Sequence, residues 1–113
     1  MDPDEVVFAI EVVDGPDGVV IRPRGELDMA TQAELRAVLE AHAASGALTL
    51  DLSGLGFLDT SGLRLILETA EAARRGGFDF AVLPGVPAVM RLFDVAGVAE
   101  LVPFRDAHDR GAP

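Results

Sequence analysis

The chain has 113 residues, half of them apolar and a quarter charged, a balance typical of one globular domain rather than of a disordered chain. It contains no cysteine, which excludes a disulfide framework, a zinc ribbon, an iron–sulfur cluster and a thiol nucleophile. Nineteen acidic and nine basic residues give a formal net charge of −10. We therefore expect no direct binding to nucleic acid or anionic lipid, because both need a basic face.

The first residues, MDPDEVVFAIEV, contain neither a basic segment nor a long apolar run, so they do not resemble a signal peptide. No stretch of the sequence approaches the roughly 18 apolar residues that a membrane span needs. These observations predict a soluble cytoplasmic domain with no membrane partner.

Two short β-branched runs, 6–13 and 19–21, are separated by turn-forming residues and predict a hairpin of antiparallel strands. The pattern then changes to a helical period. Thr31 and Glu34 have the spacing of a capping box, in which each side chain satisfies a free amide of the other residue. We expect a helix from this point to Gly46, with an apolar side made by Leu35, Val38, Leu39 and His42.

The rest of the chain repeats the alternation of strand and helix. The expected elements are a strand at 48–52, a loop at 53–59, a helix ending at Gly76, a strand at 78–82, a helix at 86–94 and a short strand at 100–103. The third helix turns Val86, Val89, Met90 and Phe93 inward, and the tail 104–113 adds at most one helical turn.

The resulting order, β-β-α-β-α-β-α-β, predicts the α/β fold class, with helices packed against a mixed, mostly parallel sheet. We expect a single domain over 1–113, with a core at about 6–102 and a short tail at 104–113. In such sheets, functional residues gather in the loops that follow the carboxyl ends of the strands.

Two such loops are candidates, 25–29 and 58–63, and the second is the more informative. It places Asp59, Thr60 and Ser61 at the start of a helix, where free amides favour negative charge. All three residues are ordinary helix caps on the simplest interpretation. A cap needs only one oxygen, however, and the surplus hydroxyl beside Gly62 suits a side chain that is modified.

Catalytic and metal sites find little support. Neither His42 nor His108 follows a candidate loop, so Ser61 has no base for a hydrolase triad. Three aspartates could imitate the magnesium site of a receiver domain, but a receiver needs a lysine and the sequence contains none: Asp28, Asp51 and Asp59. We expect no enzymatic activity, no cofactor and no metal. Met29 and Met90 lie near helix starts and are interpreted as core residues, with a partner groove as the alternative.

Residues 52–63, LSGLGFLDTSGL, resemble the signature of bacterial anti-sigma factor antagonists, which belong to the STAS-domain family. The core of that signature is aspartate, serine or threonine, Ser-Gly and an aliphatic residue, and 59–63 match it at all five positions. A second family element, Gly-Glu-Leu-Asp ahead of the first helix, is present at 25–28. The order of elements matches the family from about 6 to 102, so the resemblance implies a STAS-type fold.

The resemblance also implies a mechanism. The unphosphorylated protein would bind an anti-sigma factor, a serine kinase of the GHKL ATPase type, and so release the sigma factor. Phosphorylation of Ser61 would end this binding, and a PP2C-type phosphatase would reset it. The partner-binding surface would consist of Asp28, Asp59, Thr60, Ser61 and Gly62.

The chain departs from the family pattern at its C-terminal end, and the resemblance also allows a second function. Family members usually end in a full amphipathic helix, whereas here 104–110 are followed at once by Gly-Ala-Pro, so that helix is truncated or weak. The alternative function is a STAS scaffold, either a subunit of a stress-sensing assembly or a lipid-transport accessory protein, in which Ser61 is structural or differently regulated.

The expected effect of the phosphate follows from charge. It adds about 1.5 to 2 negative charges and three acceptor oxygens. The helix amides should tolerate it, so the fold should survive. Next to Asp28 and Asp59, the added charge should repel an acidic partner surface or overfill a pocket shaped for a hydroxyl.

Overall fold

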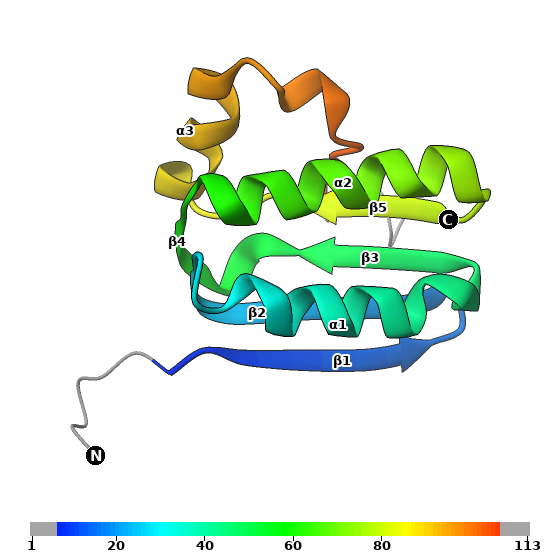
Figure 1. Cartoon of the computed structure of the whole chain (residues 1–113). Helices are drawn as coiled ribbons and strands as arrows, with labels where there is room; N and C mark the ends of the chain where they lie inside the picture. Colours follow the sequence, from blue (N-terminus) through cyan, green and yellow to red (C-terminus); the bar gives the residue numbers. More distant parts are fainter. Residues whose placement is uncertain (1–6, 107–113) are drawn as a thin grey trace.

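The computed structural model describes residues 7–106, and within them the chain forms a single α/β domain with a five-stranded mixed sheet and three α-helices. The elements in order are β1 (Ala9–Gly15), β2 (Gly18–Leu27), α1 (Gln32–His42), β3 (Ala47–Asp51), β4 (Leu55–Leu58), α2 (Thr60–Gly76), β5 (Asp79–Leu83) and α3 (Pro87–Ala96). Figure 1 shows α1 and α2 side by side over one face of the sheet.

The sheet has the order β1-β2-β3-β5, and β4 pairs with the second half of β2. Only the β1–β2 pairing is antiparallel, so the mixed, mostly parallel sheet is confirmed. The expected hairpin is also confirmed, although β2 runs six residues beyond its predicted end at Ile21. The hairpin requires a glycine at Gly18, because its φ is +122° and a Cβ there would lie 2.5 Å from the carbonyl oxygen of Ala47.

The predicted loop at 53–59 is wrong in its middle, because it contains β4. The Asp51 side chain accepts a hydrogen bond from the Ser53 amide and starts a short 3-10 turn, after which the chain runs back beside β2. Leu55 and Leu58 are buried while the two residues between them are exposed, which is not an alternating pattern. A strand this short is therefore visible only through its pairing with β2.

The predicted strand at 100–103 is also wrong. Residues Ala99–Leu101 form a 3-10 turn, and the chain reaches the sheet only at Phe104, which makes an isolated parallel bridge to Val82. The Phe104 ring packs edge-on against Phe93 of α3, with centroids 5.0 Å apart, and holds this return segment in place. Of the tail expected at 104–113, residues 107–113 lie outside the described part.

The core fills the space between the sheet and the helices. Leu35 and Leu39 of α1 and Ile66 of α2 are buried against the central strands, as the helical periodicity predicts. Two residues expected inside are instead on the surface: Val86 is the N-cap of α3 and is 42% exposed, and Met29 is 79% exposed. Within residues 7–106, no helix combines the length and apolar character needed to cross a membrane.

Candidate functional site

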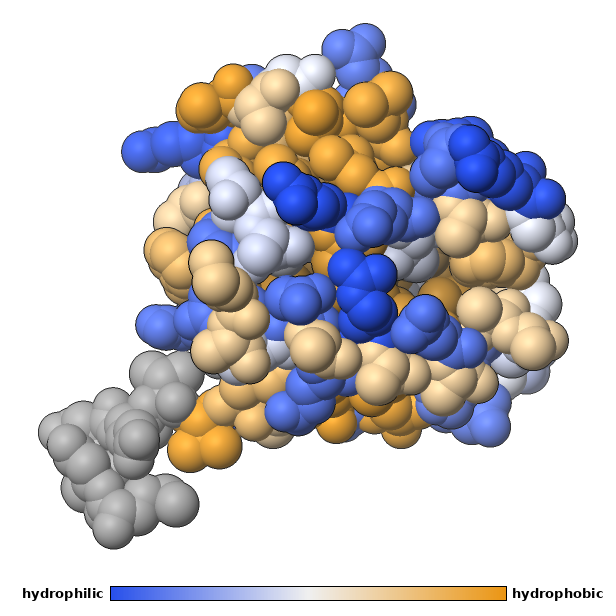
Figure 2. Space-filling view, viewed as in Figure 1, coloured by the Kyte–Doolittle hydropathy of each residue, from blue (hydrophilic) through white to orange (hydrophobic). Residues whose placement is uncertain are grey.

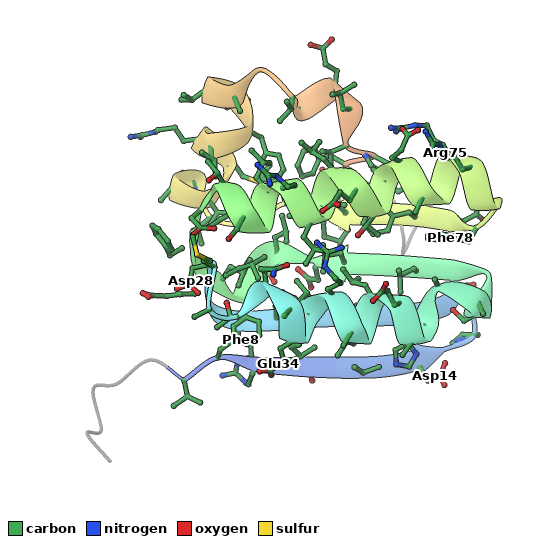
Figure 3. The ribbon with its side chains drawn as sticks, in the orientation of Figure 1. Phe8, Asp14, Asp28, Glu34, Arg75 and Phe78 are labelled. Atoms are coloured by element: carbon green, nitrogen blue, oxygen red, sulfur yellow. The ribbon has the colours of Figure 1, made fainter. Side chains whose placement is uncertain are left out.

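The two candidate loops begin side by side. Strands β2 and β4 are parallel neighbours, and Leu27 pairs with Leu58, so Asp28 and Asp59 follow adjacent strand ends. The Asp59 amide donates a hydrogen bond to the Leu27 carbonyl oxygen at 3.1 Å and ties the two loops together. Figure 3 shows Asp28 at the end of the molecule where α1 begins. The fold thus unites two motifs that lie 30 residues apart in the sequence.

Asp59 is the N-cap of α2. Its Oδ1 accepts hydrogen bonds from the Ser61 amide at 2.9 Å, the Gly62 amide at 3.1 Å and the Ser61 hydroxyl at 2.6 Å. Extended backbone at Asp59 aims the carboxylate back over the first turn of the helix. Of the three capping candidates in the sequence, Asp59 does the capping, and Ser61 has a hydroxyl that capping does not require.

The Asp59 carboxylate is held in its ionised form. Burial by itself would raise its pKa, but hydrogen bonds from the Ser61 hydroxyl and from the amides of Gly62, Ser61 and Met29 act in the opposite direction. The pKa of Asp59 consequently lies below its ordinary value. A negative charge therefore stands beside Ser61 throughout the neutral pH range.

Ser61 and Thr60 differ in their surroundings although they are neighbours. Ser61 is half-buried, and its hydroxyl hydrogen is directed at Asp59. Among residues 7–106, its Oγ accepts no hydrogen bond, so its lone pairs are free for another group. Thr60 is exposed at the first helical position and makes none of the side-chain hydrogen bonds that hold this loop.

Gly62 is buried, and no larger residue fits in its place. A Cβ there would lie 2.6 Å from Leu58 Cδ1 and 2.7 Å from Leu27 Cγ. The absence of a side chain lets α2 begin directly against the ends of β2 and β4. The structure gives Gly62 a packing role, and its part in partner binding stays a prediction.

Asp28 organises the entry to α1. Its Oδ1 accepts hydrogen bonds from the amides of Ala30 at 3.0 Å and Thr31 at 3.2 Å. The Thr31 hydroxyl accepts from the Asp28 amide at 3.0 Å and donates to the Glu26 carbonyl at 2.8 Å. The predicted capping box of Thr31 and Glu34 is therefore wrong, because the Thr31 hydroxyl is already used by the preceding loop. A partner contact by Asp28 stays a prediction.

Asp51, the third aspartate of the conceivable magnesium site, has its own partners. Its Oδ2 accepts from Arg22 Nε at 3.0 Å, and its Oδ1 accepts from the Ser53 amide at 2.9 Å. Burial would raise the pKa of Asp51, but these hydrogen bonds and the Arg22 charge lower it. Within the described residues, no three His, Cys, Asp or Glu side chains gather as a metal-ligand group. Asp51 is thus an anchor of the β3–β4 connection.

The family model described as "Mlab, STAS domain" matches residues 11–103. The chain is 31% identical to an anti-sigma F factor antagonist of Paenibacillus polymyxa over 91 residues, 78% of each protein. It is 32% identical over 89 residues to the anti-sigma-F factor antagonist RsfA of Mycobacterium tuberculosis, 75% of this chain and 70% of that protein.

Among solved structures, an anti-sigma factor antagonist from Mycobacterium paratuberculosis superposes with a TM-score of 0.77 at 29% identity. The match covers 96% of this chain and 92% of that one. Nearly the whole architecture is therefore shared with that protein.

Proposed function

The chain belongs to the STAS domain family, and from this premise we propose that it is a non-enzymatic anti-sigma factor antagonist whose binding is controlled by phosphorylation of Ser61. The partner is an anti-sigma factor that is a GHKL-type serine kinase, and its capture releases a sigma factor in the cytoplasm. The observation that carries the proposal is the Ser61 hydroxyl, which donates to Asp59 at the first turn of α2 and accepts no hydrogen bond from any residue of the described range 7–106.

The geometry supports Ser61 rather than Thr60 as the phosphate acceptor. Phosphoryl transfer depends mainly on positioning, and a hydroxyl with a fixed hydrogen presents its lone pairs in one direction. In the transfer, Ser61 Oγ bonds to the γ-phosphorus of ATP as the bond to the bridging oxygen breaks. ADP then leaves with that electron pair, and the hydroxyl proton passes to the Asp59 carboxylate, which already accepts it in a hydrogen bond, and is released to solvent when the complex opens. The less constrained Thr60 hydroxyl lacks this orientation.

The same hydrogen bond explains how a phosphate acts here. Phosphorylation removes the hydrogen that Ser61 donates to Asp59 and replaces attraction with repulsion between phosphate and carboxylate. The phosphate must turn away from Asp59, toward the surface where the partner binds. Asp59 continues to accept the two backbone amides, so α2 stays capped while the binding surface changes.

Asp28, Thr60 and Gly62 complete the proposed binding surface around Asp59 and Ser61, and a PP2C-type phosphatase removes the phosphate. The alternative function, a scaffold subunit of a stress-sensing assembly or a lipid-transport accessory protein, shares the fold. It predicts recovery of the chain in a large multi-subunit assembly rather than with a kinase.

The proposal is tested by incubating the purified chain with ATP and candidate GHKL-type anti-sigma kinases from its own genome. Phosphate located by mass spectrometry is expected on Ser61 and not on Thr60, and the phosphorylated chain is expected to lose the kinase in a pull-down. Phosphate on Thr60 with Ser61 unmodified, or equal binding of both forms, contradicts the proposal.

A further inference from the structure

Large apolar side chains are exposed beside the Ser61 loop. Met29, in the loop after β2, is 79% exposed, and Phe57, in β4, is 49% exposed. In Figure 2, which has the view of Figure 1, apolar residues alternate with hydrophilic ones along the left edge, where β2 and β4 end. Exposed apolar side chains that gather at a functional edge are typical of an interaction surface.

The backbone places Met29 and Phe57 in the two paired segments that lead to the Ser61 loop. The Leu27 carbonyl, two residues before Met29, accepts a hydrogen bond from the Asp59 amide at 3.1 Å, and the Asp59 carboxylate in turn accepts the Ser61 hydroxyl. Phe57 is 49% exposed although Leu55 and Leu58, at the two ends of β4, are buried. Neither side chain fills the interior. Phe57 lies two residues before Asp59, and Met29 lies two residues after Leu27, which is hydrogen-bonded to Asp59.

We infer that Met29 and Phe57 form an apolar rim that is buried against the anti-sigma factor when it covers Ser61; this inference rests on the proposed function. Met and aromatic residues are enriched at protein interfaces, and the unbranched Met side chain adapts to a partner surface. Closing such a rim excludes water from Ser61.

The rim supplies a physical reason for the switch. A hydroxyl can be buried at modest cost when it keeps its hydrogen bond, and Ser61 keeps one to Asp59. A phosphate of nearly two charges can be buried only at a much larger desolvation cost. Loss of binding then follows without an acidic patch on the partner.

Charge argues for a different protein as the occupant rather than a second copy of this chain. A self-complementary contact through the rim would bring together the acidic side chains of both copies, Glu26, Asp28 and Asp59, which outnumber the one basic residue beside Phe57, Arg24, in a chain of net charge −10. The same charges oppose an anionic membrane. A partner that offers an apolar patch with hydrogen-bond donors at its margin fits this edge.

The test compares rim variants with variants of equal exposure elsewhere. Met29→Ala is matched by Val95→Ala on α3, where the side chain is 77% exposed, and Phe57→Ala by Leu101→Ala, where it is 52% exposed. Binding to the purified kinase that recognises the wild-type chain is measured by calorimetry. The rim variants are expected to bind about tenfold more weakly, and the controls to change by less than about twofold.

Two further variants keep the test informative if a truncation disturbs the fold. Met29→Gln keeps the length of the side chain without its apolar character, and Phe57→Thr keeps β-propensity in β4. Both are expected to weaken binding while the melting temperature stays close to that of the wild type.

A second measurement separates the rim from a general loss of contact. Met29→Ala weakens the rim, so water should reach position 61 in the complex. Adding Ser61→Asp to Met29→Ala is therefore expected to lower the affinity by a smaller factor than Ser61→Asp does in the wild-type chain. Independent, additive effects of the two substitutions overturn the role of the rim in the switch.

The remaining outcomes separate the rim from the function on which it rests. Wild-type affinity in all rim variants, with Ser61→Asp still binding the kinase more weakly, overturns the inference and leaves the proposed function intact. A wild-type chain that binds no anti-sigma kinase overturns the proposed function itself. Rim variants that change the molecular mass of the free chain in light scattering overturn the inference by assigning the rim to self-association.

Discussion

The loops after β2 and β4 are built alike and yet differ in what they can do. Each begins with an aspartate at the end of a parallel strand, and each aspartate accepts two backbone amides at the entry to a helix. In the first loop, the Thr31 hydroxyl both donates and accepts a hydrogen bond. In the second, the Ser61 hydroxyl only donates, to Asp59. The same capping arrangement thus uses the Thr31 hydroxyl both as a donor and as an acceptor, but uses the Ser61 hydroxyl only as a donor.

The two loops also differ in the third residue after the aspartate. It is Thr31 in the first loop, where the side chain closes the loop, and Gly62 in the second, where the missing side chain makes room for Leu27 and Leu58. The first turn of α2, which carries Ser61, can therefore pack directly against these two leucines. Four predictions test whether the two loops differ as described, ordered from the largest expected effect to the smallest.

The first prediction concerns Gly62→Ala. The new Cβ would lie within 2.7 Å of two buried leucines, so α2 must shift, and overpacking of this kind typically lowers the free energy of unfolding by about 1–3 kcal/mol. Chemical denaturation measures the change. Gly56→Ala in the same segment is the control, because a Cβ there meets nothing within 4 Å. Equal stability of both variants would show that α2 does not depend on this close approach.

The second prediction separates fold from binding at Ser61. Ser61→Ala should retain kinase binding, escape phosphorylation and lose little stability, because Asp59 still accepts the backbone amides of 61 and 62. Ser61→Asp should fold but bind the kinase at least about tenfold more weakly, which corresponds to about 1.4 kcal/mol. Calorimetry with the cognate kinase measures both affinities. Equal affinities of the two folded variants would place Ser61 outside the interface.

The third prediction concerns Asp28→Asn. The amide oxygen of asparagine can still accept from Ala30 and Thr31, so the melting temperature should stay nearly unchanged. If Asp28 also contacts the partner through its charge, kinase affinity should fall by a few-fold, as is usual for a charge at an interface margin. A large drop in melting temperature without an effect on affinity would instead make Asp28 a purely structural cap.

The fourth and smallest effect is a dependence of stability on pH. Because the folded pKa of Asp59 is lowered, the carboxylate stabilises the fold above its unfolded pKa, and this contribution is lost as pH falls through the folded value. Asp59→Asn should therefore lose less stability than the wild type between about pH 5 and pH 2, the range around the ordinary value for aspartate. Acid titrations of both chains, followed by circular dichroism, measure this loss of stability. An equal loss in the wild type and in Asp59→Asn would contradict the assignment.

The helices and the hairpin were predictable because their signals are local. Leu35 and Leu39 repeat at helical spacing, and the turn between Gly15 and Gly18 separates two β-branched runs. Strand β4 and the return at Phe104 were not predictable, because each is held by a partner far away in the sequence. The exposure of Met29 was missed for the same reason: only the position of α1 relative to the strand ends decides that its side chain has no core to enter.

The sequence by itself determined the class of the fold, the adjacency of Asp59, Thr60 and Ser61 at a helix start, and the acidic character of the chain. Chain-local patterns carry that information, because helix capping and strand alternation act over a few residues. The tertiary structure decided which oxygen caps α2, which hydroxyl keeps its lone pairs, and which apolar side chains surround it. These choices depend on the pairing of β2 with β4, which brings Leu27 and Asp59, 32 positions apart, within one hydrogen bond of each other.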